Sequence, residues 1–206
     1  MKIYRKIRLS VLLTITLMLC GCGSLADVKD DTITVSAKGA VREAIVGDGE
    51  KNDYSVEELR SFVEEDIEEY NQNTKSGNID LKSCEMKDGV IRIEIAYASY
   101  VDYAAYHKTT LFYGTLKEAK SKGFDFNTEF VDNNGDTAAA ATILAHGDEW
   151  HVVILEEPVD VQVSGDILYV SKNAEITGKR KAKIADEKDE GAERITTDSL
   201  VYLIYK

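Results

Sequence analysis

Apolar and polar positions alternate along much of this chain, and that alternation predicts β-strands. The clearest case is a pair of runs, residues 79–86 and 90–97, on either side of Lys87-Asp88-Gly89. An Asp-Gly turn between two alternating runs is typical of a β-hairpin. The second run carries its apolar side chains on one face, as Ile91, Ile93, Ile95 and Tyr97. This pattern indicates a sheet with one buried side.

A period of three to four residues begins after Ser55 and predicts an amphipathic helix that ends at Gly77. Ser55 and Glu58 have the spacing of a capping box, in which the hydroxyl accepts from an early amide and the carboxylate reaches back. The apolar stripe of this helix consists of Leu59, Phe62, Val63, Ile67 and Tyr70. The other positions are strongly acidic, and we interpret them as a solvated face rather than a cation-binding one.

A second helix is predicted for residues 101–122. Its apolar stripe consists of Val101, Ala105, Phe112, Leu116 and Ala119. Gly114 weakens this helix by roughly 1 kcal/mol relative to alanine. Thr115 and Glu118 repeat the capping-box spacing, so a helix that breaks and restarts at Thr115 is an alternative.

The remaining patterns predict further strands. Residues 32–36 and 41–46 are expected to form an N-terminal hairpin. Ala138 to Ala145 is ambiguous: alanines favour a helix, but the position between two turns favours a strand, which would pair with residues 151–156. The C-terminal part is expected to form an antiparallel meander through residues 159–163, 167–171, 175–184 and 200–205. The predicted fold class is therefore α+β, with antiparallel sheet, two helices packed on one face and a C-terminal β meander.

The first residues follow a different pattern, which is that of an export signal. Four basic residues precede residues 9–19, an apolar stretch of 11 residues. A transmembrane helix needs roughly 20 apolar residues, so this stretch is short for one. A charged start, a short apolar core and a small residue before the cleavage point are typical of a secretory signal peptide.

The end of that stretch, Leu19-Cys20-Gly21-Cys22, resembles a bacterial lipobox. The resemblance implies that the thiol of Cys22 receives a diacylglyceryl group and that the chain is cut just before it. The expected organisation is a signal peptide at 1–21, a lipidated cysteine with a flexible tether at 22–31, and one extracytoplasmic α+β domain at 32–206. An ordinary signal peptide with cysteines in its tail is the alternative. Each buried CH₂ contributes about 0.8 kcal/mol, so two or more acyl chains hold a protein stably at the membrane.

The net negative charge of the chain limits the kinds of partner that it can bind. The net charge is −12, and the predicted signal contains four basic residues and no acidic ones, so the processed chain is more acidic still. Such a protein is repelled by phosphate backbones, and nucleic acid is not an expected partner. The expected partners are the membrane, through the N-terminal lipid, and a glycan, a peptide or an envelope protein.

No catalytic residue, metal or cofactor is assigned from the sequence. The three histidines, His107, His146 and His151, have no zinc-hydrolase spacing, and Cys84 lies in a predicted strand where burial is the simpler interpretation. Asp132, Asn134 and Asp136 have calcium-loop spacing, but Thr137 and Ile143 replace the glycine and glutamate that such a loop requires. A plain turn explains the same residues. Paired carboxylates for sugar cleavage remain open in so acidic a chain.

Phenol rings gather in the second predicted helix and form the candidate ligand-binding site. On a helix the residues opposite the apolar stripe are Tyr100, Tyr103, Tyr106, His107 and Tyr113. Tyrosine offers stacking area and a polar tip, which suits a sugar or a peptide. The alternative is that these rings cover the sheet and close the core. A basic run at residues 179–183 is interpreted as a hairpin edge kept soluble by lysines, or else as a contact for anionic polymers.

Four stretches carry a wider resemblance: residues 54–71, residues 111–126 with a Gly-Thr-x-x-Glu-Ala core, residues 167–171 and residues 202–206. With these stretches the chain resembles a group of lipoproteins of anaerobic Gram-positive bacteria. The resemblance implies the outer face of the cell membrane and this architecture, and it implies no activity. We expect a non-catalytic binding module, and the alternative is a cell-envelope hydrolase or accessory enzyme. His107 or His151 beside buried acids in a pocket would favour the enzyme.

Overall fold

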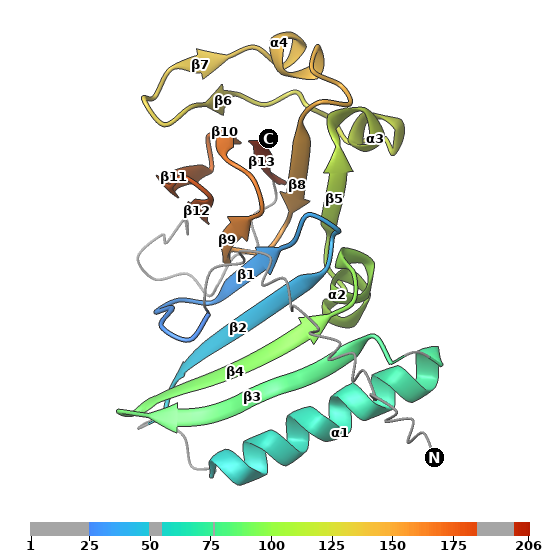
Figure 1. The fold of residues 1–206 in the computed structure, drawn as a ribbon, viewed down its shortest axis with the longest axis vertical. Helices are drawn as coiled ribbons and strands as arrows, with labels where there is room; N and C mark the ends of the chain where they lie inside the picture. Colours follow the sequence, from blue (N-terminus) through green and yellow to red (C-terminus); the bar gives the residue numbers. More distant parts are fainter. Residues whose placement is uncertain (1–24, 50–54, 76, 185–199) are drawn as a thin grey trace, which may run out of the picture.

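The structure, a computed structural model, describes residues 25–49, 55–75, 77–184 and 200–206. The predicted signal peptide and Cys22 lie outside the described residues. Within these ranges the chain forms two sheets and four helices, which confirms the predicted α+β class (Figure 1). No helix in the described ranges combines the length and the apolar character needed to cross a membrane.

The first sheet has seven strands in the order β11-β12-β9-β1-β2-β4-β3. Every neighbouring pair is antiparallel except β1 and β9, which run parallel. The predicted hairpins β1–β2, β3–β4 and β11–β12 are all present. The strands of this sheet are β1 (Thr32–Val35), β2 (Val41–Asp48), β3 (Ile79–Lys87), β4 (Val90–Tyr97), β9 (Asp160–Val163), β11 (Ala174–Gly178) and β12 (Lys181–Ile184).

The second sheet has six antiparallel strands in the order β5-β8-β13-β10-β6-β7. Its central strand β13 is buried at every position, as expected for an apolar run covered on both faces. The strands of this sheet are β5 (Leu111–Thr115), β6 (Phe130–Val131), β7 (Thr137–Ala138), β8 (His151–Leu155), β10 (Ile167–Ser171) and β13 (Val201–Tyr205).

The main core lies between the two sheets. Leu155 and Leu203 of the second sheet belong to one cluster with Ile33, Val161 and Ile95 of the first. The intervening side chains of β5, β8 and β13 point the other way, into a second cluster with the short helices and the β6–β7 segment. Because both faces of the second sheet are covered, its strands read as apolar runs rather than as alternating ones.

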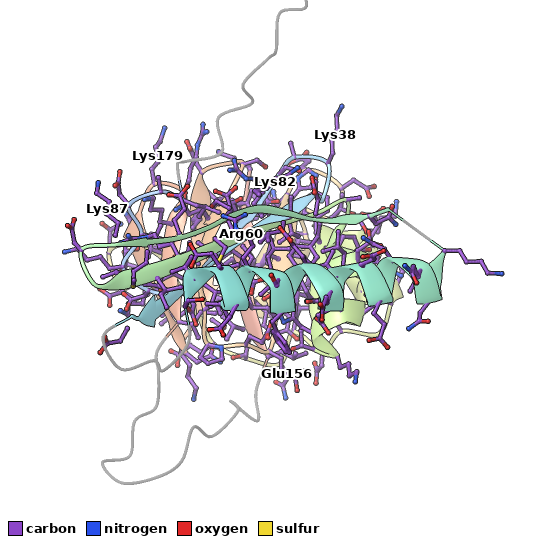
Figure 2. The ribbon with its side chains drawn as sticks, turned by 90° about the horizontal axis from the view of Figure 1, so that it is seen from below. Lys38, Arg60, Lys82, Lys87, Glu156 and Lys179 are labelled. Atoms are coloured by element: carbon purple, nitrogen blue, oxygen red, sulfur yellow. The ribbon has the colours of Figure 1, made fainter. Side chains whose placement is uncertain are left out.

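The helix α1 (Val56–Thr74) begins as predicted, with a complete capping box between Ser55 and Glu58. Its last turn closes on Lys75, which has φ 52° in the left-handed region, rather than on Gly77 as expected. The helix packs along β3, and Figure 2 shows Arg60 between the two elements. The Arg60 guanidinium donates to the carbonyl of Cys84 at 2.7 Å. Cys84 is buried, as the sequence suggested.

The predicted helix over residues 101–122 is wrong. The chain forms α2 (Tyr100–His107), strand β5 and α3 (Leu116–Ser121) in its place. The helix α2 ends at Lys108, which has φ 55°. Leu111 and Phe112 are then buried on opposite faces of β5. Consecutive side chains of a strand point to opposite faces, whereas the apolar stripe of a helix faces one side only. The alternative restart at Thr115 is confirmed, because its capping box with Glu118 opens α3.

Two further expectations about the C-terminal part are corrected. Residues 138–145 form the end of β7 and the helix α4 (Ala140–Leu144), and β8 pairs with β5 and β13 instead. The turn at residues 164–166 is present, but the strands on either side of it enter different sheets, so no simple meander forms. Strand β9 pairs with β1 and β12 in the first sheet, and β10 pairs with β13 and β6 in the second. None of these partners is the neighbouring strand in the sequence, so no local pattern predicts the pairing.

Candidate functional site

The predicted tyrosine face is divided between α2 and β5. Tyr103 is 1% exposed, and the ring of Tyr97 on β4 packs against it with 5.0 Å between ring centroids. Tyr100 and Tyr113 are partly buried, and Tyr113 donates to the carbonyl of Ala37 at 2.7 Å. Tyr106 donates to the carboxylate of Asp66 on α1. These rings therefore join elements of the fold to one another.

A cluster of buried and partly buried polar groups, here called the buried cluster, joins α2 to β2, β4 and the β8–β9 connection. We define it as Glu43, Tyr97, Tyr103, His107 and Glu157. The Tyr97 hydroxyl donates to Glu43 at 2.6 Å, and His107 Nε2 lies 2.9 Å from that hydroxyl and 3.1 Å from the same carboxylate. The Tyr103 hydroxyl donates to Glu157 at 2.8 Å. The carboxylates thus accept hydrogen bonds from ring groups inside the protein, as buried polar groups require.

The electrostatics of the buried cluster follow from burial beside acids. Burial and then the charge of Glu43 raise the pKa of both Tyr97 and Tyr103 far above the usual phenol value, so both hydroxyls stay protonated donors. Burial alone would lower the pKa of His107. The hydrogen bond and the charge of Glu43 outweigh it, and the pKa of His107 is raised above its ordinary value of 6.5.

The enzyme hypothesis requires a histidine beside buried acids in a pocket, and the buried cluster meets only the first of these two conditions. His107 does lie beside a buried acid, since Glu43 is only 6% exposed. Among the described residues, neither lines the hollows of about 780, 510, 300 and 340 Å³. A general base needs the reacting proton within hydrogen-bond reach, and these groups face one another instead. His151 is also packed between rings, with Tyr113 at 5.9 Å and Tyr205 at 5.8 Å.

A different region offers an open surface. A hollow of about 780 Å³, here called the Trp150 groove, lies where the β6–β7 turn, β10, the β11–β12 turn and the end of β13 meet. Its volume is in the usual range of small-molecule sites. In Figure 2, Lys179 of this groove projects at the margin of the molecule. The lining residues are Asp132, Asn133, Trp150, Asp166, Ile167, Leu168, Tyr169, Ile176, Thr177, Gly178, Lys179 and Lys206.

Trp150, the only tryptophan of the chain, is held in place from several directions. The backbone N–H of Trp150 donates to the carbonyl of His146, and its backbone carbonyl accepts from the N–H of Leu116, both at 3.2 Å. The indole stacks on the His146 imidazole with centroids 3.7 Å apart and planes at 9°. The Tyr169 ring follows at 6.1 Å and 32°. The groove therefore contains two neighbouring aromatic rings, and the indole is pre-oriented.

Two carboxylates line the same groove, and both are held ionised. The side chain of Asp132 accepts from the amides of Asn134 and Asp136 at 2.8 and 2.9 Å, and these bonds lower its pKa. Lys179 lies 2.9 Å from Asp166, and this contact, with Arg180, lowers the pKa of Asp166. Each carboxylate has two oxygens with several acceptor positions, so hydrogen-bonding capacity is left for a ligand.

The calcium-like spacing of Asp132, Asn134 and Asp136 has a local role here. Asp132 closes its own turn, and Gly135 takes the left-handed φ of 83° that the turn needs. Across the described ranges, no group of three or more His, Cys, Asp or Glu side chains is placed to hold a metal ion.

Sequence reasoning missed the Trp150 groove, because its residues come from five separated segments. The available signals were the single tryptophan, the Asn-Gly turn after Asn133 and the basic run, whose Lys179 and Arg180 bind Asp166. Comparison of the chain with protein-family models, curated proteins and solved structures finds no match. The functional argument therefore depends on the geometry of the molecule.

Proposed function

We propose that this chain is an extracytoplasmic lipoprotein, anchored to the cell membrane through Cys22, that binds a ligand in the Trp150 groove without catalysing a reaction. The anchoring is supported by the order of basic residues, short apolar stretch and lipobox-like Leu19-Cys20-Gly21-Cys22. The observation that carries the binding function is the pairing of a pre-oriented indole with ionised carboxylates in one open groove. Sites of this kind combine apolar surface with a few placed polar groups.

Binding is favoured over hydrolysis by the state of the acids. Cleavage of a glycosidic bond by two carboxyl groups needs one of them protonated near neutral pH, through a raised pKa. In the groove the pKa values of Asp132 and Asp166 are both shifted downward. The carboxyl group with a raised pKa among the described residues is Asp160 on β9, raised by burial, and it does not line the groove. The acids of the groove are therefore suited to accept hydrogen bonds from a ligand.

The anchoring is tested with the full chain expressed in a Gram-positive host. We expect the chain and a Cys20→Ala variant to sediment with membranes, and a Cys22→Ala variant to appear in the medium. Cys20 is the matched control, since it precedes the predicted cleavage point. Mass spectrometry of the N-terminal peptide should show a diacylglyceryl group on Cys22. A Cys22→Ala variant that still partitions with membranes would contradict the anchor.

A further inference from the structure

We propose that the Trp150 groove binds a neutral, pyranose-based oligosaccharide. This inference depends on the binding function above and adds the chemical class of its ligand. A pyranose ring has an apolar C–H face and a rim of hydroxyls, so it needs a flat aromatic surface with hydrogen-bonding groups at its margin. The groove provides both, because Trp150 and Tyr169 line it together with Asp132, Asp166 and Thr177.

The aromatic pair is arranged as a platform. Trp150 is fixed by its stack on His146 and by hydrogen bonds of both its backbone groups, so binding costs little further ordering. Tyr169 is carried by β10, which is hydrogen-bonded on both sides, to β13 and to β6. The two rings lie 6.1 Å apart, are tilted by 32°, and both line the groove. Aromatic side chains with an apolar body and a polar tip suit ligands that are part apolar and part wet.

The polar margin selects for hydroxyls over anions. Ionised Asp132 and Asp166 accept hydrogen bonds and repel carboxylate or phosphate groups. Two lysines, Lys179 and Lys206, line the groove beside the two carboxylates, and Lys179 is already paired with Asp166 at 2.9 Å. The whole chain is acidic as well, with a net charge of −12. A polyanionic glycan would therefore meet repulsion, whereas a neutral or N-acetylated one would not.

An extended peptide is the rival ligand, because β11 is an edge strand and contributes to the groove. Edge strands capture peptides through a row of free backbone groups. Strand β11 is short, and its pairing register shifts between Ile176 and Gly178. Bulges of this type and a lysine at the strand end are devices that block edge pairing. The geometry therefore favours a sugar over a peptide.

The test uses tryptophan fluorescence of the full chain in micelles of a zwitterionic, sugar-free detergent. Because Trp150 is the only tryptophan, its emission reports on this groove alone. The probes are the β-1,4-linked tetrasaccharides of N-acetylglucosamine and of glucose, polygalacturonate as the anionic glycan, and a mixed-sequence decapeptide. Co-sedimentation with purified cell-wall glycan, stripped of its anionic polymers, distinguishes a wall ligand from a free sugar.

We expect a saturable change in emission with at least one neutral tetrasaccharide and none with polygalacturonate. Tyr169→Ala should weaken binding at least about tenfold, since one aromatic contact is lost. Asp166→Asn should weaken it less. Tyr70→Ala on α1 is the matched control, since Tyr70 is partly buried, is packed against the core and lies outside the groove. Its binding should equal that of the unchanged chain, and circular dichroism checks that each variant folds.

The inference is overturned if no neutral sugar changes the emission, if the peptide does so instead, or if Tyr169→Ala binds sugar as well as the unchanged chain. Failure of the proposed function has different signatures. Shorter sugars found by mass spectrometry after incubation would show catalysis while leaving the sugar site in place. A chain that binds sugar but carries no lipid would contradict the proposed anchor and leave the proposed sugar site standing.

Discussion

The buried cluster and the Trp150 groove use the same kinds of side chain in opposite ways. In the buried cluster, phenols donate to carboxylates inside the protein, as from Tyr97 to Glu43 and from Tyr103 to Glu157. In the groove, carboxylates are held by Lys179 or by amides of their own turn, and the rings line an open hollow. Polar groups that satisfy one another stabilise the fold, whereas groups with capacity left over can receive a ligand.

This difference shows why a tyrosine-rich stretch is a poor guide to a binding surface. Seven aromatic side chains fall close together in the sequence between residues 97 and 113, yet the hydroxyls of Tyr97 and Tyr103 donate to Glu43 and Glu157 of the same protein. The groove is lined by only two aromatic side chains, Trp150 and Tyr169, which come from separate segments. Substitutions in the buried cluster should therefore change stability and leave sugar binding intact, and substitutions in the groove should do the reverse.

The largest effect is expected for Tyr97→Ala. The ring is 2% exposed and packs against Tyr103, so its loss should lower the free energy of unfolding by about 3–5 kcal/mol. Urea denaturation followed by circular dichroism measures this. Tyr97→Phe keeps the ring and loses the hydroxyl contacts with Glu43 and His107, and it should cost about 1–3 kcal/mol. Sugar binding by the folded fraction should be unchanged, and a Tyr97→Ala variant of normal stability would undo the comparison.

A smaller effect is expected for Gly165→Ala at the end of the groove. A Cβ atom at Gly165 would lie 2.3 Å from the carbonyl oxygen of Lys206, so the backbone must shift, at a cost of about 1–3 kcal/mol. The shift also moves Asp166, so sugar binding should weaken too. Gly147→Ala is the control, because its nearest atom would be 3.9 Å away. Equal unfolding midpoints for the two variants would contradict the close approach.

The buried cluster should also make stability depend on pH. The pKa of His107 in the folded protein is raised above the ordinary 6.5 by Glu43, so the folded state holds this proton more tightly. The contribution is complete below about pH 6.5 and is lost as the pH rises through the folded-state value. Melting temperatures measured from pH 5.5 to 8.5 should show this loss. A His107→Gln variant should show a smaller decline, and an identical pH profile would remove His107 as its source.

The smallest effect on stability is expected for Asp166→Asn. Its pairs with Lys179 and Arg180 are exposed, and exposed ion pairs contribute little to folding. The unfolding midpoint should stay within error of the unchanged chain, while sugar binding weakens. Glu43→Gln is the matched carboxylate in the interior, and it should lower the midpoint without affecting binding. A large loss of stability in Asp166→Asn would mean that the groove is also structural.

The sequence was informative where a local rule decides the outcome. The β3–β4 hairpin, the Ser55 capping box and the restart at Thr115 follow from residues within a few positions of one another. The sequence was misleading where contacts between distant segments decide which element forms. Residues 111–115 carry a helix-like stripe, but both their faces are covered, and pairing with β8 outweighs local propensity. The groove is formed by that same long-range assembly, so no window of the sequence predicts it.

The parallel pairing of β1 with β9 has a kinetic consequence. Thr32 lies beside Asp160, so the first sheet joins an N-terminal hairpin to a strand that is synthesised much later. Closing so long a loop is entropically costly, and high contact order slows folding. Until β9 arrives, one edge of β1 is exposed and open to mispairing with other chains. The middle of this sheet, rather than its ends, should therefore set the rate at which the protein matures.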